Sequence, residues 1–389
     1  MQQTVILVVD DEPDLQQLIN LKFRKKISTG EYIFHFARNG AEALDIISKD
    51  ESITLILTDI NMPVMDGLTL LSRLNDLDNR LLRSVIVSAY GDMENIRIAM
   101  NRGAYDFITK PINLNDLEIT IEKSLKEIEN YKQALLNRDK LIAFQQELDI
   151  AASIQTSILP KTFPAFPERK EFDICARMIP AKEVGGDFYD YFLIDKNRLG
   201  VIIGDVSGKG IASALLMAVC KTLLKATAYR GMPVDNVLSE LNDILFEESP
   251  SHMFVTLFYG VLDTRNGRFE YSNGGHNSPY VISTNGDIKQ LENIGGLILG
   301  IMRDIEFESN AITLQQGDSI LFYTDGITEA FNCENEEFNE ERLEKTLSEN
   351  LRLTATEQIA NVIKCVKSFS DNSPQSDDIT CMMLKYLKH

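Results

Sequence analysis

The fold of the first part of the chain is indicated by a stretch that reads Val5-Ile6-Leu7-Val8-Val9-Asp10-Asp11. A short apolar, β-branched run is typical of a strand buried on both faces, and here two carboxylates follow where the run ends. Further apolar runs (Leu55–Thr58, Val85–Val87, Phe107–Ile108) alternate with helical patterns (Gly40–Ser48, Leu68–Asp76, Met93–Arg102). This alternation predicts an α/β domain with a parallel sheet that is covered by helices on both faces.

Polar side chains follow these predicted strands, at the edge of the sheet where ligands of such domains bind. They are Asp10, Asp11, Asp59, Ser88 and Lys110. Carboxylates form the kind of oxygen site that Mg²⁺ prefers, and a carboxylate beside that metal can attack a phosphoryl group. Ser88 and Lys110 would then hold the phosphoryl oxygens.

The same residues, together with Met62-Pro63, Asp66-Gly67, Ala89 and Pro111, resemble a two-component receiver domain over about residues 3–125. The resemblance implies a doubly wound α/β fold with five parallel strands, and phosphorylation of Asp59 by a cognate histidine kinase. It also implies a set of roles: Mg²⁺ held by Asp10, Asp11, Asp59 and the Asn61 carbonyl, a phosphate contact from Lys110, a cis Lys110–Pro111 bond, and switch positions at Ser88 and Phe107. Phe107 has no hydroxyl where tyrosine is common. The alternative is a receiver-like fold with an inactive pocket.

A long helix is predicted over residues 115–160, because this stretch contains no Gly and its first Pro is Pro160. Its apolar residues keep a 3/4 spacing in two sets, Leu117, Ile121, Leu125, Ile128 and Leu135, then Leu141, Phe144, Leu148 and Ala151. Residues 116–158 as one helix would span roughly 65 Å. Two interpretations stay open: a helix that packs on its own domains, or a dimeric coiled coil with a register break near residues 136–140.

Residues 165–389 combine strand and helix signals in a different order, which predicts a multidomain chain with an α+β sandwich in this part. The strand-like runs are Leu199–Ile203, Phe254–Leu262, Phe269–Ser272, Tyr280–Ile282, Ser319–Tyr323 and Ile379–Leu384. Helical patterns cover Ala212–Tyr229, Asp235–Phe246 and about Glu357–Phe369.

Aspartates lie at the edges of these apolar runs, in four segments that contain Gly, Ser or Thr. They are Asp187 and Asp190, Asp205, Asp325, and Asp377 with Asp378. No Cys or His lies nearby, and ligation by oxygen alone selects Mg²⁺ or Mn²⁺. Four carboxylates carry more charge than one cation offsets, so we predict two metals ~3.5–4 Å apart that activate a water for attack on phosphorus.

These segments resemble the metal-dependent Ser/Thr phosphatases of the protein phosphatase 2C type, in particular the bacterial branch with sporulation and stress-response phosphatases. The resemblance begins near Glu147 and includes Leu148–Ala151, Ile154-Gln155, Leu159-Pro160 and Asn273–Asn277. It implies an αββα sandwich with two Mn²⁺ or Mg²⁺ held by Asp187, Asp205, Asp325, Asp377 and the Val206 carbonyl. Asp190 and Asp378 would support these ligands. The implied substrate is a phosphorylated anti-sigma-factor antagonist.

One position departs from the wider family, because Ser207 stands where a histidine would protonate the leaving oxygen. The general acid is therefore unassigned between water and His276. His276 has the alternative of a hydrogen bond that stabilises a turn. Lys182 could reach a phosphate, or it is a solvated surface lysine.

The composition narrows the partners and the location. A net charge of −19 argues against a nucleic-acid binder and against a basic membrane patch. We expect no membrane-spanning run and no signal peptide, since Val5–Val9 leads directly into two aspartates. Five scattered cysteines suggest reduced, buried thiols in a cytoplasmic protein.

The sequence is therefore interpreted as a response regulator with a receiver (1–125), a helical linker (115–160) and a phosphatase domain (165–389). We expect no kinase domain after the last acidic motif, so any opposing kinase is a separate protein. The main rival is a non-catalytic adaptor that binds a partner through a phosphatase-like domain. A DNA-binding regulator is the second rival, and the absence of a basic recognition helix argues against it.

Overall fold

The computed structural model describes residues 3–77, 79, 81–89, 91–248, 253–349, 351, 353–371 and 373–387. It divides into two compact units, Met1–Ala143 and Phe144–His389, which are described separately. The first unit contains a sheet of five parallel strands in the order β2-β1-β3-β4-β5. Their bounds are β1 Thr4–Val9, β2 Tyr32–Ala37, β3 Ile53–Asp59, β4 Arg83–Ala89 and β5 Asp106–Lys110. The predicted doubly wound domain is confirmed, and its order reverses between β1 and β3, where Asp10 and Asp59 lie.

The described residues between these strands form five helices, and the Asp66-Gly67 motif explains how one of them begins. They are α1 Pro13–Lys22, α2 Arg24–Ser28, α3 Gly40–Lys49, α4 Gly67–Asn75 and α5 Met93–Asn101. The Asp66 side chain caps α4 by accepting a hydrogen bond from Thr69 N. A Cβ on Gly67 would lie 2.1 Å from the Asp59 carbonyl oxygen, so only glycine lets this helix start beside the end of β3.

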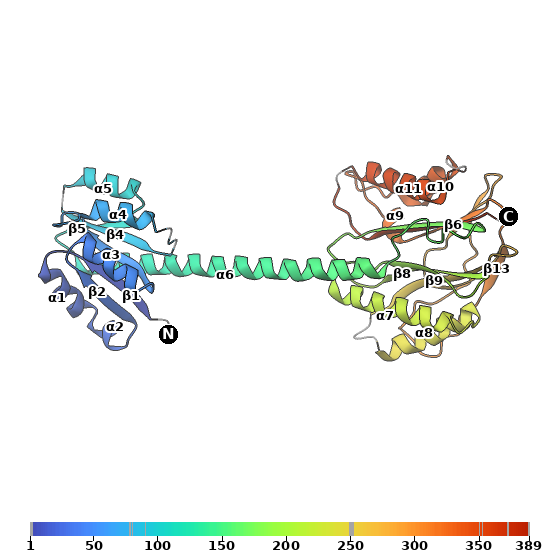
Figure 1. Cartoon of the computed structure of the whole chain (residues 1–389), viewed down its shortest axis with the longest axis horizontal. Coiled ribbons are helices and arrows are strands. Elements are labelled where there is room, and N and C mark those ends of the chain that lie inside the picture. Colours follow the sequence, from blue (N-terminus) through green and yellow to red (C-terminus); the bar gives the residue numbers. More distant parts are fainter. Residues whose placement is uncertain are drawn as a thin grey trace. The chain divides into compact units, whose positions relative to one another are not determined.

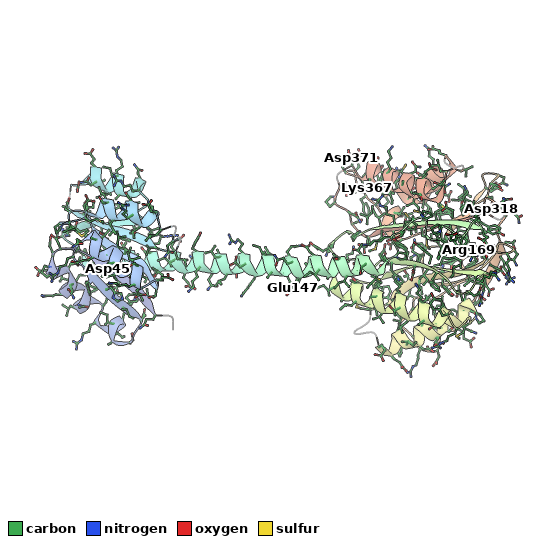
Figure 2. The ribbon with its side chains drawn as sticks, in the orientation of Figure 1. Asp45, Glu147, Arg169, Asp318, Lys367 and Asp371 are labelled. Carbon is green, nitrogen blue, oxygen red and sulfur yellow. The ribbon has the colours of Figure 1, made fainter. Side chains whose placement is uncertain are left out.

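Helix α6 runs from Leu114 to Ile158. This confirms the long helix that was predicted over residues 115–160, with slightly different bounds. Its first turns pack Leu117 and Ile121 into the receiver core. Its middle section exposes apolar side chains, among them Leu136, Leu141, Ile142 and Phe144. Figure 2 labels Glu147 on the same helix. The boundary between the two compact units falls inside this helix, upstream of the predicted domain start at residue 165.

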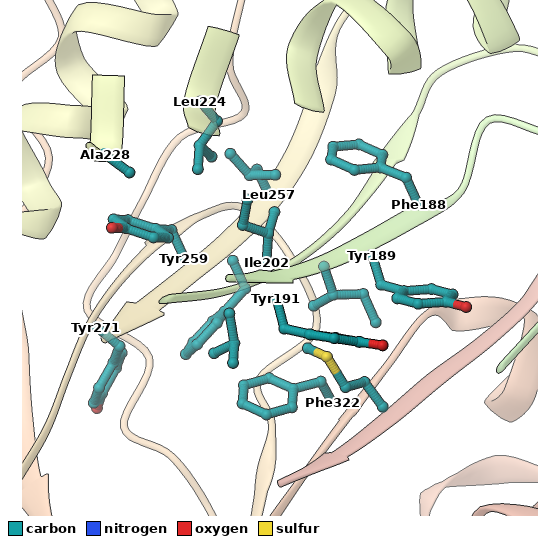
Figure 3. Close-up of a cluster of buried hydrophobic side chains, with 14 of the residues drawn as sticks. Phe188, Tyr189, Tyr191, Ile202, Leu224, Ala228, Leu257, Tyr259, Tyr271 and Phe322 are labelled. Carbon is teal, nitrogen blue, oxygen red and sulfur yellow. The ribbon is translucent and has the colours of Figure 1, made fainter. Parts of the chain in front are cut away.

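The second unit contains two antiparallel five-stranded sheets, ordered β13-β10-β9-β8-β7 and β12-β11-β14-β15-β6. The first comprises β7 Phe188–Leu193, β8 Arg198–Val206, β9 Val255–Asp263, β10 Arg268–Gly274 and β13 Asn310–Thr313. The second comprises β6 Phe172–Ile179, β11 Tyr280–Ile282, β12 Ile288–Gln290, β14 Ser319–Tyr323 and β15 Ile379–Tyr386. Aromatic side chains join the sheets: the rings of Phe258 in β9 and Phe322 in β14 lie 5.6 Å apart at their centroids. Figure 3 shows Phe322 within this buried cluster.

Helices cover the outer faces of both sheets, which confirms the predicted αββα sandwich (Figure 1). The helices are α7 Ile211–Ala228 and α8 Val234–Glu248 on the first sheet, then α9 Asp325–Thr328, α10 Asn339–Ser348 and α11 Ala355–Ser370 with the second. The buried faces of α7 and α8 pack on the first sheet. Leu224 of α7, Leu241 of α8 and Leu257 of β9 belong to the same buried cluster.

Two expectations need correction. By length and composition, α7 is apolar enough to cross a membrane, although the sequence predicted no such segment. Its buried residues include Met217, Cys220 and Leu224, so in the structure this apolarity serves packing on the sheet. All five cysteines are free, but Cys333 is exposed and Cys365 is half-buried, so the expectation of uniformly buried thiols is wrong.

Candidate active site

The receiver carboxylates meet at the strand ends as predicted. Ligand oxygens of Asp10, Asp11 and Asp59 lie within 4.8 Å of one another, and no other such trio of Asp, Glu, His or Cys side chains occurs within the described ranges. Asp10 and Asp59 are buried while Asp11 is exposed. Burial raises the pKa of Asp10 above its usual value. The oxygen-only donor set and its negative charge fit Mg²⁺.

Lys110 at the end of β5 supplies the cation of this pocket. Its Nζ lies 2.6 Å from Asp59 Oδ2 and 3.1 Å from Asp10 Oδ2. Burial alone would lower the pKa of Lys110, but its hydrogen bonds with Asp59 and Asp10 raise it, so the side chain stays an ammonium. The Lys110–Pro111 peptide bond is cis, as predicted.

The other predicted receiver residues surround this pocket less closely. The Asn61 backbone N–H donates to Asp59 Oδ1 at 3.2 Å, so the Asn61 backbone lies beside the Asp59 carboxylate. Ser88 is buried at the end of β4, and its hydroxyl lies 3.5 Å from Asp92 Oδ2. Phe107 is partly exposed on β5.

In the second unit, acidic loops from both sheets converge at one end of the sandwich. Asp187 directly precedes β7, and Asp205 lies near the end of the adjacent strand β8. From the other sheet, Asp325 follows β14 and Asp377 precedes β15. The Thr324 hydroxyl joins the two sheets by donating to Asp187 Oδ2 at 2.7 Å.

The carboxylates of this group raise one another's pKa. Burial raises the pKa of Asp205 to about 7, and the charges of Asp325 and Asp377 contribute to the rise. Burial and the neighbouring Asp205 raise the pKa of Asp187 well above its usual range. Burial and Asp377 also raise the pKa of Asp325. Asp187 is buried, and Asp205, Asp325 and Asp377 are half-buried. A cluster of repelling carboxylates whose ligand atoms are all oxygens fits hard divalent cations.

Close backbone packing surrounds this cluster. A Cβ on Gly186 would lie 2.5 Å from the Val206 carbonyl oxygen and 3.2 Å from Asp205 Oδ1. Gly210 is the N-cap of α7 and has φ +90°, a conformation that L side chains rarely adopt. These two glycines therefore let the loops of Asp187 and Asp205 pass close together and let α7 begin beside them.

The two predicted supporting aspartates have different surroundings. Asp378 is buried and accepts hydrogen bonds from Gly186 N at 2.8 Å and Asp187 N at 3.4 Å, so it supports the Asp187 loop as expected. Asp190 lies inside strand β7, not in a loop, and it pairs with Lys221 at 2.7 Å and Lys225 at 3.2 Å. Asp190 therefore holds α7 against the sheet, which corrects the expectation that it supports a metal ligand.

Lys209 and Thr324 are residues of the site that sequence reasoning missed. Lys209 Nζ lies 2.8 Å from Asp377 Oδ2 and 2.6 Å from the Ser376 carbonyl oxygen, so it partly neutralises the cluster. The sequence could have indicated both residues as part of the site. Lys209 lies between Gly208 and Gly210 of the Asp205 motif, and Thr324 directly precedes Asp325.

His276 and Lys182, the two residues considered for contact with the substrate, fit the alternative interpretations given above. His276 is buried, and its backbone N–H and carbonyl bond to the Asn273 side chain, which fits the turn-stabilising interpretation. Its Nδ1 lies 2.9 Å from Thr256 Oγ1. Lys182 is exposed, which fits the surface interpretation.

His276 is expected to stay neutral down to acidic pH, because burial lowers its pKa from 6.5 to about 4. The unfolded chain takes up this proton more readily, so the contribution of a neutral His276 to stability is full above about pH 6.5 and is lost as the pH falls toward 4. The check is an NMR titration of the four histidines, with His276→Gln identifying the signal. A His276 signal that titrates near pH 6.5 would contradict the buried, neutral state.

Comparison with known proteins agrees with this geometry. Residues 195–387 match the family model of Stage II sporulation protein E (SpoIIE), and residues 6–122 match that of the response regulator receiver domain. The chain is 30% identical to phosphoserine phosphatase RsbU of Bacillus subtilis over 259 residues, which cover 66% of this chain and 76% of RsbU. It is 31% identical to protein IcfG of Synechocystis sp. over 262 residues, which cover 60% of this chain but only 40% of IcfG.

A solved structure supports the fold of the second unit. The SiaA-PP2C domain of Pseudomonas aeruginosa matches with a TM-score of 0.56 at 20% identity, over 64% of this chain and 98% of that domain. Together with the RsbU match and the two family models, this structure assigns the receiver part and the phosphatase part of the chain to known families. The chain thus belongs to the SpoIIE family of phosphatases of the protein phosphatase 2C type, and it carries a response regulator receiver domain ahead of its phosphatase domain.

Proposed function

We propose that this chain hydrolyses phosphoserine or phosphothreonine on a protein, and that phosphorylation of Asp59 controls the rate. The observation that carries the proposal is the 2.7 Å hydrogen bond from Thr324 Oγ1 to Asp187 Oδ2, because it joins the acidic loops of two sheets at one site. RsbU of Bacillus subtilis is a phosphoserine phosphatase, and the match covers 76% of its length.

In this proposal, Asp187, Asp205, Asp325, Asp377 and the Val206 carbonyl hold two Mn²⁺ or Mg²⁺ ions. When bound, these cations supply Lewis-acid chemistry for hydrolysis of a phosphate monoester. Thr324 and Asp378 orient Asp187 from opposite sides, through its carboxylate and its backbone. Lys209, 42% exposed, lies where a substrate phosphate arriving at Asp377 would meet a positive charge.

The activity is tested by phosphate release from a phosphoserine protein in the presence of Mn²⁺. We expect release to stop with EDTA and to resume with excess Mn²⁺, and we expect a phosphotyrosine protein to be a poor substrate. No Mn²⁺-dependent release from any phosphoprotein would favour the rival, a non-catalytic adaptor that only binds its partner.

The receiver half of the proposal places Mg²⁺ among Asp10, Asp11, Asp59 and the Asn61 carbonyl. Lys110 already contacts Asp59 Oδ2, so it is placed to pair with a phosphoryl group on that carboxylate. A cognate histidine kinase would supply the phosphate, and Ser88 and Phe107 would respond to it. The substrate would be a phosphorylated anti-sigma-factor antagonist in the cytoplasm.

Transmission would run along α6, which is part of both compact units. The exposed apolar residues in its middle section suit a homodimer that pairs this helix with its copy. Light scattering of residues 1–160 tests the dimer, and a monomer at micromolar concentration would remove it from the proposal. Helix α7, which begins just after the Asp205 motif, would pass the change to the site.

A further inference from the structure

A cavity of about 260 Å³ in the phosphatase domain is lined by residues of α9, of the end of α11 and of the loop before β15. Its walls include Gly326, Ala330, Phe331, Val366, Ser376 and Ile379. Two of these residues adjoin proposed metal ligands in the chain, since Gly326 follows Asp325 and Ser376 precedes Asp377. The cavity therefore lies beside the acidic cluster and shares two walls with the loops that carry it.

The walls of this cavity are held in place by hydrogen bonds and close packing. The Gln375 side chain, which also lines the cavity, donates from Nε2 to the Asp377 carbonyl oxygen at 2.7 Å and to the Ile179 carbonyl oxygen at 2.8 Å. A Cβ on Gly326 would lie 1.9 Å from the Asp378 carbonyl oxygen, so the first turn of α9 packs directly on the same loop. The cavity is therefore a preformed feature of the fold, as ligand sites usually are.

The size and lining of the cavity suit one apolar side chain. Pockets for drug-sized ligands usually enclose roughly 300–1,000 Å³, and this cavity is smaller. Ala330, Val366 and Ile379 are buried, whereas Phe331 stays 38% exposed although it forms part of the apolar wall. An exposed aromatic side chain beside a preformed pocket is a typical contact for an apolar group of a binding partner.

The adjoining acidic site indicates which molecule would supply that apolar group. A phosphoserine held at Asp325 and Asp377 brings the neighbouring residues of its protein to the walls that Gly326 and Ser376 form. An extended chain spans at most about 3.3–3.6 Å per residue, so residues within three positions of the phosphoserine lie within about 10 Å of it. Chain geometry therefore favours the protein substrate itself as the occupant of the cavity.

Lys367 adds a positive charge to the lining of the cavity. It is an exposed residue in the last turn of α11 and is labelled in Figure 2. It forms no ion pair with a residue that the structure describes. Because the whole chain carries a net charge of −19, Lys367 would attract a carboxylate of the substrate at a point where the overall charge repels one.

We propose that this cavity is a specificity subsite of the phosphatase. It binds an apolar side chain that lies within three residues of the phosphoserine, with Phe331 as its aromatic wall, and Lys367 pairs with an acidic residue of the same substrate. The inference rests on the proposed phosphatase function and deepens it, because it names the sequence feature by which the enzyme selects a phosphoprotein.

The test uses the full chain with Mn²⁺ and a series of phosphoserine peptides whose flanking positions are alanine. Leucine replaces one alanine at a time, at each of the three positions before and after the phosphoserine, and the alanine peptide is the reference for every protein. We expect leucine at one position to raise kcat/KM about tenfold. This ratio should fall to about twofold in Phe331→Ala, and likewise in Ser370→Leu, which fills the cavity from the end of α11.

The matched control for the aromatic wall is Phe246→Ala on α8. Phe246 is 42% exposed, which is similar to Phe331, and it does not line the cavity. This variant should keep the wild-type ratio between the leucine and alanine peptides. Because the two cavity variants change the lining in opposite ways, one removing volume and one adding it, either of them tests the subsite if the other does not fold.

The charge is tested with glutamate at the same peptide positions. Lys367→Gln should lower the preference for the best glutamate peptide about threefold. Lys364→Gln changes an exposed lysine of the same helix that does not line the cavity, so it should leave the preference unchanged. An unchanged glutamate preference in Lys367→Gln would overturn the proposed ion pair.

Equal kcat/KM values for all leucine and alanine peptides in the wild type would overturn the subsite, and the cavity would then suit another occupant, such as a segment of a second copy. A leucine preference that persists in both Phe331→Ala and Ser370→Leu would overturn it as well. Failure of the proposed function looks different, because the wild type would then release no phosphate from any peptide. Peptide binding measured by fluorescence polarisation decides the subsite in that case, since equal Kd values for the leucine and alanine peptides would overturn it.

Discussion

Replacing Asp205 with asparagine is expected to lower kcat for Mn²⁺-dependent phosphate release by about a thousandfold or more. Asp205 interacts with Asp187 of its own sheet and with the charges of Asp325 and Asp377 of the other, so it would hold the cations together with ligands from both sheets. Losing about 4 kcal/mol of transition-state stabilisation corresponds to this factor. The measurement is kcat on a phosphoserine protein at saturating Mn²⁺.

The same variant distinguishes lost chemistry from lost structure. In the metal-free protein the pKa of Asp205 is raised to about 7, so its ionised form disfavours the folded state as the pH rises from 3.8 toward 7. Asparagine removes this repulsion, and Tm without metal should not fall at pH 7.5. The stabilisation by Mn²⁺ should largely disappear. Asp287→Asn, in the exposed turn between β11 and β12, is the matched control and should behave as wild type. Near-normal kcat in Asp205→Asn would remove Asp205 from the site.

Asp59→Asn is expected to abolish the response of the phosphatase to a small acyl phosphate donor in the presence of Mg²⁺. In the wild type, phosphorylation of Asp59 should change the phosphatase rate about 5- to 150-fold, which is the usual range of coupling between two sites. The amide cannot accept the phosphoryl group, and it also removes the charge that Lys110 Nζ contacts at 2.6 Å. The measurement is the rate with and without the donor for both proteins.

The control for that experiment is Asp45→Asn, because Asp45, labelled in Figure 2, is an exposed aspartate of α3 whose carboxylate pairs with Lys49 of the same helix. It should respond to the donor as the wild type does. Equal wild-type rates with and without the donor would separate the phosphatase from control by its receiver. A response that persists in Asp59→Asn would place the phosphorylated residue elsewhere.

Strands whose composition is uniformly apolar could be predicted from the sequence, and those that depend on a distant partner could not. Strands β8, β9, β14 and β15 fall where their apolar runs placed them. Strand β7 was overlooked because Asp190 lies in its middle and gives it the composition of a loop. That buried charge is acceptable only because Lys221 and Lys225, on α7, neutralise it.

The residues of the phosphatase site also divide into those that local sequence predicts and those that depend on a distant partner. The four acidic segments were recognisable because aspartate beside glycine at the end of an apolar run is a local pattern. Thr324 and Gln155 gained their roles from partners far along the chain, since Thr324 bonds to Asp187 and Gln155 to Gly185. Local spacing carries no information on such pairs, and only the folded sandwich brings them together.

The two hydrogen bonds between the Gln155 side chain, in the last turn of α6, and the Gly185 backbone show where the phosphatase domain begins. A fragment that starts at residue 165 would retain every acidic motif of the phosphatase domain. It would lack the Gln155 side-chain amide, which bonds to both backbone groups of Gly185. The self-sufficient catalytic module therefore starts within the second half of the helix, in keeping with the compact unit that begins at Phe144. A different sensor grafted onto this enzyme would have to be joined upstream of that point, so the last turns of the helix travel with the catalyst.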